Sequence, residues 1–371
     1  MPSRQESFGG TDVSVETLLG RSVVDVVRGN LGEYLAGANV LVTGAGGSVG
    51  AELCAQLAVL NVRELVLVDQ SEASLVGAAR SLQPILERGS CRAVLTDVKS
   101  RARTLAVFER YRPDVVFHAA AYKHVPLLEA FPIEGVATNV LGTQNVVDAA
   151  RRVGVRRFVL FSTDKAVQPT NILGETKRVA EWIVADAGAE PPHARYATVR
   201  LGNVIDSAGS IVPVFRQQLA RGGPVTVTHR SATRYLMTAC EAAGVAIVGG
   251  ALADSDSVFF LDSGPPVSVL DLARRLTSTA ACDVEIEFVG LRQGERLREQ
   301  RCWAGDDVSP TPCRQVLRSP MHQVDPAWLR RSLASLARYV EHASAAGVRD
   351  VLGQMHAARD LAGASPVTTR S

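Results

Sequence analysis

A glycine-rich turn near the start of the chain constrains the fold more than any other feature of the sequence. Residues 44–50 read GAGGSVG, follow an apolar run directly and open a helical pattern. The glycine spacing suits a tight turn, close approach of the backbone to pyrophosphate and close packing of the helix on the strand. The first N–H groups of such a helix, at its positive dipole end, favour phosphate. The turn therefore predicts a dinucleotide site.

Short apolar runs alternate with longer helical patterns over the first two hundred residues. Because the runs are apolar throughout, both faces of the predicted strands should be covered. Strand and helix repeated at this spacing are typical of a parallel sheet with helices on both sides. We therefore expect an α/β fold, a doubly wound parallel sheet of the Rossmann type with a smaller C-terminal substrate-binding lobe. The runs are 40–44, 64–69, 92–97, 114–120, 157–162 and 197–202, and helical patterns include 51–60 and 140–153.

The pattern loosens after residue 205. Shorter strand signals at 225–229, 258–262 and 284–290 are mixed with helices, which suits a substrate-binding lobe. Residues 300–371 hold few strand signals, and the end of the chain (365–371) is expected to be frayed. The predicted organisation is an N-terminal arm (1–37) with helical patterns at 13–19 and 23–35, a NAD-binding Rossmann domain (38–205), the lobe (206–330), interleaved with that domain, and a C-terminal helical tail (331–371).

Composition argues against several other kinds of protein. The chain is 46% hydrophobic and 21% charged, and its net charge of +2 indicates neither a nucleic-acid nor a membrane partner. No apolar run reaches the ~18–20 residues that span a bilayer, and the polar first ten residues lack the core of a secretion signal. We therefore expect a cytoplasmic protein with reduced thiols and no metal site. The six cysteines are Cys54, Cys91, Cys240, Cys282, Cys302 and Cys313.

Lysine is rare in this chain. Of its 40 basic residues only four are lysine (Lys99, Lys123, Lys165 and Lys177), and the other 36 are arginine. Since arginine is effectively never deprotonated in proteins, a lysine kept in such a sequence points to a place that needs a removable proton. Chance suffices to explain Lys99, whereas the other three lysines fall within the motifs described below.

The end of the second apolar run indicates which dinucleotide is bound. Asp69 stands where a carboxylate can accept hydrogen bonds from ribose hydroxyls and repel a 2′-phosphate. Gln70 and Ser71 provide no arginine for such a phosphate, so NAD is favoured and NADP is the alternative. Asp69 could equally cap the helix that starts at Ser71. The residues predicted at the cofactor are Gly44, Gly46, Gly47, Ser48, Val49, Gly50, Asp69, Gln70, Ser71, Asp97 and Val98.

Two stretches carry a family resemblance. Residues 158–178 read FVLFSTDKAVQPTNILGETKR, and residues 114–143 lie just before them. The chain resembles the extended short-chain dehydrogenases/reductases that make polysaccharide sugars, most closely the UDP-N-acetylglucosamine 4,6-dehydratases, from residue 39 to about 300. LLGR (18–21) is similar to the stretch before the catalytic domain of long, membrane-anchored members, so the chain resembles a free catalytic domain. The other matching motifs are GAGGSVG (44–50), RLGNV (200–204), TRYLMT (233–238) and GLRQGER (290–296).

The resemblance implies a reaction and the residues that perform it. A 4,6-dehydratase moves hydride from sugar C4 to the nicotinamide, which creates a ketone that acidifies the C5–H bond. A base then removes the C5 proton, an acid protonates the leaving C6 hydroxyl, and hydride returns to C6. By resemblance, Lys165 is the base, Asp164 the acid and Thr163 a hydrogen-bonding aid at the C4 oxygen. The alternative is a surface salt bridge at a strand end.

Lys177 corresponds to the lysine of the YxxxK motif, which holds the nicotinamide ribose in the family. The tyrosine of that motif is replaced by Leu173. The long-form dehydratases that the chain resembles carry methionine there, so a nonpolar residue is compatible with dehydration. It argues against ordinary alcohol oxidation and C4 epimerisation, which normally need the phenol.

The resemblance also indicates which residues face the substrate. Lys123 lies where the family contacts both cofactor and substrate, and its neighbour His124 is interpreted as structural rather than as a proton shuttle. An arginine suits a diphosphate because its planar fork can bind two oxygens. Further cofactor positions are Ala119, Ala120, Ala121 and Ser162, and positions facing the UDP-sugar are Asn139, Asn203, Arg234, Arg292 and Glu295, each with a structural hydrogen bond or an exposed charge as the alternative.

These observations lead to one functional hypothesis with two alternatives. We expect a homo-oligomeric, retaining 4,6-dehydratase of UDP-N-acetylglucosamine or a close relative. A C5-inverting or 5,6-alkene-forming dehydratase is the alternative within the enzyme class. A catalytically idle homologue that binds dinucleotide is the alternative outside it; the intact residues 163–165 argue against that reading, and Leu173 keeps it open.

Overall fold

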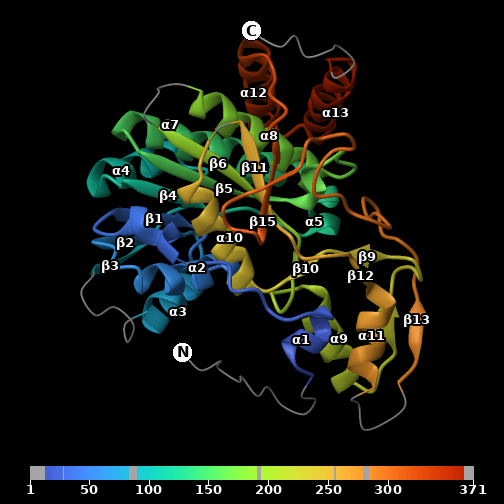
Figure 1. Ribbon diagram of the computed structural model, residues 1–371. Helices are drawn as coiled ribbons and strands as arrows, with labels where there is room; N and C mark the ends of the chain where they lie inside the picture. The colour runs from blue at the N-terminus through green and yellow to red at the C-terminus, as the bar shows by residue number, and fades with distance from the viewer. Residues whose placement is uncertain are drawn as a thin grey trace.

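A nine-stranded sheet lies at the centre of the molecule (Figure 1). The computed structural model describes residues 13–27, 29–82, 90–189, 194–254, 256–278 and 284–362. Neighbouring strands are parallel from β3 at one edge as far as β11, which confirms the predicted Rossmann-type fold. In sheet order the strands are β14 (Ser309–Pro310), β15 (Val316–Pro320), β11 (Ser257–Leu261), β6 (Arg195–Leu201), β5 (Arg157–Thr163), β4 (Val115–His118), β1 (Asn39–Thr43), β2 (Glu64–Asp69) and β3 (Ser90–Leu95).

The strand order reverses at the centre of this sheet. β1 is followed by β2 and β3 on one side, and the chain then returns to β4 and β5 on the other side. In open α/β sheets, ligands bind outside the carboxyl ends of the strands at such a reversal. The glycine-rich turn follows β1, and residues 119–121 follow β4, so both predicted cofactor segments lie at the reversal.

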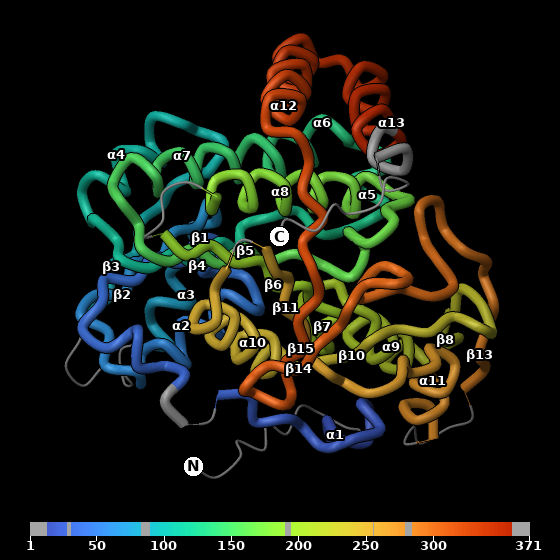
Figure 2. The backbone as a smooth tube through the Cα atoms, turned by 45° about the horizontal axis from the view of Figure 1, so that its top comes forward, coloured from blue at the N-terminus to red at the C-terminus, as the bar shows by residue number. Residues whose placement is uncertain are grey.

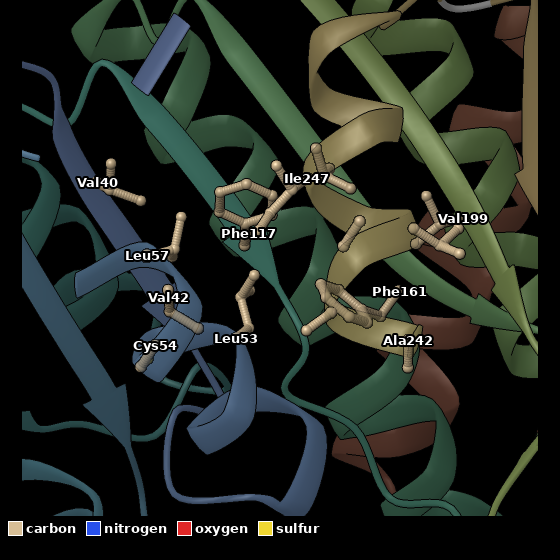
Figure 3. Packing of buried hydrophobic residues seen from close by; sticks show 14 of the residues in the cluster. Val40, Val42, Leu53, Cys54, Leu57, Phe117, Phe161, Val199, Ala242 and Ile247 are labelled. Carbon is tan, nitrogen blue, oxygen red and sulfur yellow. The ribbon is translucent and has the colours of Figure 1, made fainter. Parts of the chain in front are cut away.

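Helices cover both faces of the sheet, as its apolar strands require. Apolar side chains of α2, α3 and α10 pack on one face, and those of α4, α7 and α8 pack on the other. Figure 3 shows the first face, where Val42 and Phe117 of the sheet share a cluster with Leu53 of α2 and Ile247 of α10. These helices are α2 (Ser48–Ala58), α3 (Glu72–Leu82), α4 (Arg101–Tyr111), α7 (Thr143–Val153), α8 (Ile172–Gly188) and α10 (Ala239–Ala251).

β11 and β15 differ from the sequence prediction. The strand predicted at 258–262 belongs to the central sheet, beside β6, and its assignment to the lobe is wrong. All five residues of β11 are buried, as in a strand covered on both faces, so its uninterrupted apolar run was the sign of a central position. β15 pairs with β11 in antiparallel orientation within the stretch where few strands are expected. Its sequence, VLRSP, has both buried and exposed positions and ends in proline, which is typical of a short strand near a sheet edge.

The lobe consists of three two-stranded sheets and two helices around its own apolar cluster. That cluster includes Phe215 of α9 and Leu272 of α11. Helix α1 (Val15–Leu19) adds Leu18 and Leu19 to it (Figure 1 and Figure 2), so the start of the described chain is part of the core of the lobe. The elements are β7 (Asn203–Val204) with β10 (Leu236–Met237), β8 (Val225–Val227) with β13 (Ile286–Phe288), β9 (Thr233–Arg234) with β12 (Val267–Ser268), α9 (Ile211–Ala220) and α11 (Val269–Thr277).

The second helical pattern of the arm, 23–35, is only partly realised. η1 (Gly29–Leu35) is a 3-10 helix, and residues 22–27 are not helical. The N–H of Val24 donates to the carboxylate of Glu241 (2.8 Å), which also accepts from two nitrogens of Arg21. These bonds fix the segment against the N-terminus of α10, so a tertiary contact overrides the local helical preference.

Two C-terminal helices, α12 (Pro326–Glu341) and α13 (Ala345–Ala362), pack on α8 (Figure 1). The ring of Trp182 on α8 lies 5.9 Å from Trp328 of α12 and 5.5 Å from His356 of α13, centroid to centroid. The two helices therefore cover the side of α8 that the sheet leaves open, which explains why most residues of α8 are buried. The remaining helices are α5 (Val125–Ala130), α6 (Pro132–Gly135), the π-helix η2 (Val136–Gly142) and the 3-10 helix η3 (Asp164–Ala166).

The described residues offer neither a membrane span nor a metal cluster. Among them, no helix is both long and apolar enough to cross a bilayer. No group of three or more His, Cys, Asp or Glu side chains in these ranges could hold a metal ion. The five described cysteines are free thiols. Cys282, the polar first ten residues and the predicted frayed end at 365–371 lie outside the described residues.

Candidate active site

A pocket opens at the carboxyl ends of β1, β2 and β4. Most of the residues predicted at the cofactor line this one pocket, although they come from four separate segments of the chain. Three further lining residues, Val68, Thr96 and Thr138, were not predicted. The predicted residues in the lining are Gly44, Gly47, Asp69, Gln70, Asp97, Val98, Ala119, Ala120 and Ala121.

The glycine-rich turn is shaped as a dinucleotide site requires. Gly44 has a φ of +68°, and a Cβ there would lie 2.6 Å from the backbone nitrogen of Ala120. A Cβ on Gly50 would lie 2.1 Å from the carbonyl oxygen of Gly44, so only glycine lets α2 pack this closely on β1. Gly47 lines the pocket at the N-cap of α2, whose first N–H groups are available to a phosphate.

The other predicted residues of this turn support it from outside the pocket lining. The N–H of Gly46 donates to Asp69 (2.9 Å). The hydroxyl of Ser48 accepts from the N–H of Ala208 in the lobe (3.3 Å), and Val49 packs against the core. Ser48 therefore links the turn to the lobe.

Asp69 has the place expected of a residue that contacts ribose. One carboxylate oxygen accepts from the N–H of Gly46 and the other from the N–H of Ser71, both at 2.9 Å. Ser71 comes just before α3 begins at Glu72, and it is the hydroxyl of Ser71, not Asp69, that accepts from the N–H of Ser74 in the first turn of this helix (3.4 Å). A carboxylate has about four acceptor sites, so both oxygens can still accept from a ribose. The described lining of this pocket contains no arginine.

The predicted catalytic residues meet at the carboxyl end of β5. The Lys165 ammonium donates to a carboxylate oxygen of Asp164 (2.9 Å) and to the side-chain oxygen of Asn203 (3.2 Å). The Thr163 hydroxyl donates to the same oxygen of Asp164 (3.1 Å). The side chains of Asp164 and Lys165 are 1% and 16% exposed, so the pair is not a surface salt bridge.

Glu299 completes this cluster and was not predicted. One of its carboxylate oxygens lies 3.8 Å from the Lys165 ammonium, and the residue is buried. Burial raises the pKa of Glu299; Lys165 lowers it in part and Asp164 raises it again. Glu299 follows the GLRQGER motif by three residues, and its charge in a polar stretch gave no sign of burial.

Lys177 is buried beneath the site, on α8. Burial lowers the pKa of Lys177 to about 8, against a partial increase from Glu181. His118 lies in the same region between the hydroxyls of Thr43 (2.7 Å) and Thr143 (2.9 Å), and burial, with Lys177 nearby, lowers its pKa to about 3. The role predicted for Lys177 at the nicotinamide ribose stays a prediction.

Two predicted contact residues are occupied by structural hydrogen bonds. The amide of Asn139 accepts from the N–H of Tyr122 and donates to its carbonyl and to the hydroxyl of Thr176. Asn139 is fully buried and therefore fixes the loop after β4, which matches its structural alternative. The hydroxyl of Ser162 donates to Glu181 (2.7 Å), away from the catalytic cluster.

Lys123 connects the two halves of the site. Its ammonium donates to the hydroxyl of Ser207 (3.1 Å), which follows β7 in the lobe. Burial lowers the pKa of Lys123, and burial together with Lys123 lowers the pKa of His124. The imidazole of His124 lies against Gly209, a packing position that fits its structural interpretation.

Three of the predicted substrate residues of the lobe lie on strand β9 and on the neighbouring loop of the GLRQGER motif. Arg234 donates to the carbonyl of Leu297 (3.2 Å), and Arg292 pairs with Glu295 within the loop of the GLRQGER motif. Arg292 is 63% exposed, so the part of its guanidinium that Glu295 does not bind faces solvent. The carbonyl of Gly294 accepts from Asn171, the N-cap of α8, which ties this loop to the catalytic side of the sheet.

A second charged cluster, also unpredicted, lies behind β5. Glu181 of α8 accepts from Arg178 (2.6 Å) and from two nitrogens of Arg200 on β6 (both 2.8 Å). All three side chains are fully buried. Burial alone would raise the pKa of Glu181, but Arg200, Arg178 and the Ser162 hydroxyl lower it to about 2.

Comparison with known proteins identifies the family. The family model described as "Polysaccharide biosynthesis protein" matches residues 40–320. The capsular polysaccharide biosynthesis protein CapD of Staphylococcus aureus is 42% identical over 292 residues, which cover 78% of this chain and 49% of CapD. The probable polysaccharide biosynthesis protein EpsC of Bacillus subtilis is 41% identical over 311 residues, 81% of this chain and 52% of EpsC. The chain thus spans about half the length of these relatives.

Solved structures agree with this comparison. Pen of Bacillus thuringiensis is 28% identical, with a TM-score of 0.71 over 77% of this chain and 90% of Pen. The UDP-glucose 4-epimerase of Thermus thermophilus, solved with NAD, shares the fold at 20% identity, with a TM-score of 0.61 over 71% of this chain and 89% of the epimerase. The match of the family model and the identity to CapD and EpsC agree with the resemblance seen in the motifs, and the chain belongs to the polysaccharide biosynthesis protein family.

Proposed function

We propose that this chain is a nucleotide-sugar 4,6-dehydratase that removes water from UDP-N-acetylglucosamine or a close relative. The observation that carries the proposal is the buried hydrogen bond between Lys165 and Asp164 at the carboxyl end of β5. An acid and a base lie there within one hydrogen bond of each other, on the strand next to β4, whose following residues line the dinucleotide pocket. Dehydration across C5 and C6 needs such a pair.

The residues of the pocket fit NAD. The Gly44–Gly47 turn and the N-terminus of α2 would hold the pyrophosphate, Asp69 the adenosine ribose and Lys177 the nicotinamide ribose. When bound, the nicotinamide supplies the redox chemistry, accepting hydride from C4 of the sugar and returning it to C6. The chain itself supplies the proton transfers between these two events.

One shared proton can serve both catalytic groups. Moving the proton of the Lys165–Asp164 hydrogen bond from nitrogen to oxygen leaves a neutral amine and a carboxylic acid. The amine can take the C5 proton, and the acid can protonate the C6 hydroxyl, which leaves as water. These two transfers return the pair to ammonium and carboxylate, so the elimination step needs no further proton from solvent. Lys165 then returns its proton to C5, which retains the configuration, and the proton released from the C4 hydroxyl on oxidation restores the lysine to its ammonium form.

Leu173 favours dehydration over epimerisation. Its side chain, in the first turn of α8, is buried in the core, and no phenol stands at that position to take a proton from the C4 hydroxyl. The nucleotide-sugar class is supported by relatives named UDP-glucose 4-epimerase, which are 32–34% identical to this chain. The exposed Arg292 offers a planar fork suited to the diphosphate.

Incubation of the purified protein with UDP-N-acetylglucosamine and a trace of NAD tests the proposal. Mass spectrometry should show a product lighter by one water, and no NADH should accumulate because hydride returns within the same turnover. Stoichiometric NADH without loss of water would indicate a simple dehydrogenase. A product of unchanged mass with inverted C4 would indicate an epimerase, and binding without any product would indicate an idle homologue. Proton NMR of the product distinguishes retention from inversion at C5 and from a 5,6-alkene.

A further inference from the structure

Glu299 places a second buried carboxyl group beside the catalytic lysine. Its nearer oxygen lies 3.8 Å from the Lys165 ammonium, and the Asp164 oxygen lies at 2.9 Å. The other oxygen of Glu299 and the other oxygen of Asp164 are buried and have no hydrogen-bond partner in the described part of the chain. An unsatisfied buried carboxylate oxygen destabilises a fold, so a cluster selected for stability alone would not contain two of them.

Of the positively charged groups near Glu299, Lys165 is the one that forms an ion pair with it among the described residues. Arg234 and Arg296 also act on Glu299 through their charge. However, the guanidinium of Arg296 donates to the Val167 carbonyl and the Thr170 hydroxyl, and that of Arg234 donates to the carbonyl groups of Thr233 and Leu297. Among the described ion pairs, the one that Glu299 forms is with Lys165.

We infer that Glu299 is a positioning residue that controls when Lys165 gives up its proton. The inference rests on the proposed function, in which Lys165 must become neutral to act as a base. A charged Glu299 at this distance favours the ammonium form of Lys165. When Glu299 is protonated, Asp164 is the counter-charge of Lys165 that remains close among the described residues. Burial favours the protonated form of Glu299 and the charge of Lys165 opposes it, so the charge states of the two groups are coupled.

Lysine titration tests this coupling without any turnover. Reductive methylation with ¹³C-formaldehyde labels the four lysines, and a Lys165→Arg sample identifies the Lys165 signal by its absence. In Glu299→Gln, the NMR titration midpoint of that signal should fall by about one pH unit or more, because an adjacent negative charge is lost while the shape is kept. Glu299→Asp, which keeps the charge, should leave the midpoint close to that of the wild type. Glu341→Gln, on the exposed end of α12, is the matched control and should change nothing.

Turnover provides the second measurement. With Glu299→Gln, the acidic limb of the kcat/KM profile should move to lower pH, and kcat should fall about tenfold because the lysine becomes a weaker base. KM should stay within about twofold of the wild type, since Glu299 contacts Lys165 and not the substrate. If Glu299 had only a structural role, its loss would lower kcat without shifting the acidic limb of the kcat/KM pH profile.

The outcomes separate the two proposals. An unchanged Lys165 midpoint in folded Glu299→Gln overturns the inference, even if the wild type dehydrates its substrate. A shifted midpoint in a protein that forms no dehydrated product supports the coupling and rejects the proposed function. If Glu299→Gln does not fold, Glu299→Asp still decides, because a midpoint that moves while the charge is kept contradicts the inference.

Discussion

Two buried charged clusters flank β5, and they differ in how many of their carboxylate oxygens are hydrogen-bonded. In the cluster behind the strand, both oxygens of Glu181 accept hydrogen bonds, from Arg178, Arg200 and Ser162. In the catalytic cluster, Asp164 and Glu299 each keep one buried oxygen without a partner in the described residues. Consecutive residues of the strand serve the two clusters, because Ser162 and Thr163 point to opposite faces of the sheet.

The difference supports the proposal that the cluster behind β5 stabilises the fold and that the other cluster performs the chemistry. A carboxylate with every acceptor site used has one stable protonation state, and the pKa of Glu181, lowered to about 2, reflects that. A carboxyl group with a free buried oxygen can gain or lose a proton at lower cost. Groups of the second kind are the ones expected to move protons.

Lys165→Arg tests the catalytic cluster with the largest expected effect. The change keeps the positive charge, but arginine cannot lose its proton near neutral pH, so dehydration should fall by about 100- to 10,000-fold. Hydride removal at C4 needs no C5 base, and single-turnover absorbance with solvent-deuterium exchange at C5 should show the reaction stopping between these steps. Lys99→Arg, the same change at a partly exposed ion pair, is the control. Activity close to the wild type in Lys165→Arg would remove this lysine from the mechanism.

Glu181→Gln tests the structural cluster. It leaves two buried arginines facing a neutral amide, which should lower the free energy of unfolding by about 3–5 kcal/mol. Urea denaturation measures the loss, and Glu109→Gln, in an exposed ion pair, should change stability by less than about 1 kcal/mol. Activity per folded molecule should persist. A stable but inactive Glu181→Gln protein would show that Glu181 takes part in the reaction. It would contradict the division into one structural and one catalytic cluster.

Acid should remove the difference between wild type and Glu181→Gln. The pKa of Glu181 is lowered on folding from 4.5 to about 2. The resulting stability, about 3 kcal/mol, is therefore present above pH ~4.5 and is lost as the pH falls towards 2. Urea midpoints of both proteins at pH 7 and near pH 2.5 should converge at the lower pH. A gap that stays constant with pH would show that packing, and not charge, accounts for the contribution of Glu181.

Asp69 shares a feature with each cluster. Both of its carboxylate oxygens accept hydrogen bonds, like those of Glu181, but the residue lines the predicted cofactor pocket. Asp69→Ala should lower the preference for NAD over NADP by about tenfold, since it removes a ribose acceptor and the charge that opposes a 2′-phosphate. Isothermal titration with both dinucleotides measures this, with Glu72→Ala, the exposed first residue of α3, as control. Tighter binding of NADP than NAD by the wild type would contradict the role given to Asp69.

The sequence revealed those parts of the site that depend on backbone and local spacing. The glycine turn and the run 64–69 were recognisable because each feature is local, and β2 has the predicted bounds. The buried charged residues could not be recognised from the sequence. Glu181 lies in a helical pattern and Arg200 in a strand pattern, where a charged residue is usually exposed, and only the tertiary fold buries them. Glu299 reaches Lys165 from a distant segment, so no spacing rule links the two.

The position of helix α1 has a consequence for how the chain is made. Leu18 and Leu19 lie in an apolar cluster whose other buried members run from Ile205 to Val284. Synthesis proceeds from the N-terminus, and early segments usually fold first. Here the leucines of α1 must wait until the lobe has been translated before they find their partners. Until that point, the side chains of Leu18 and Leu19 lack the contacts that bury them in the folded chain.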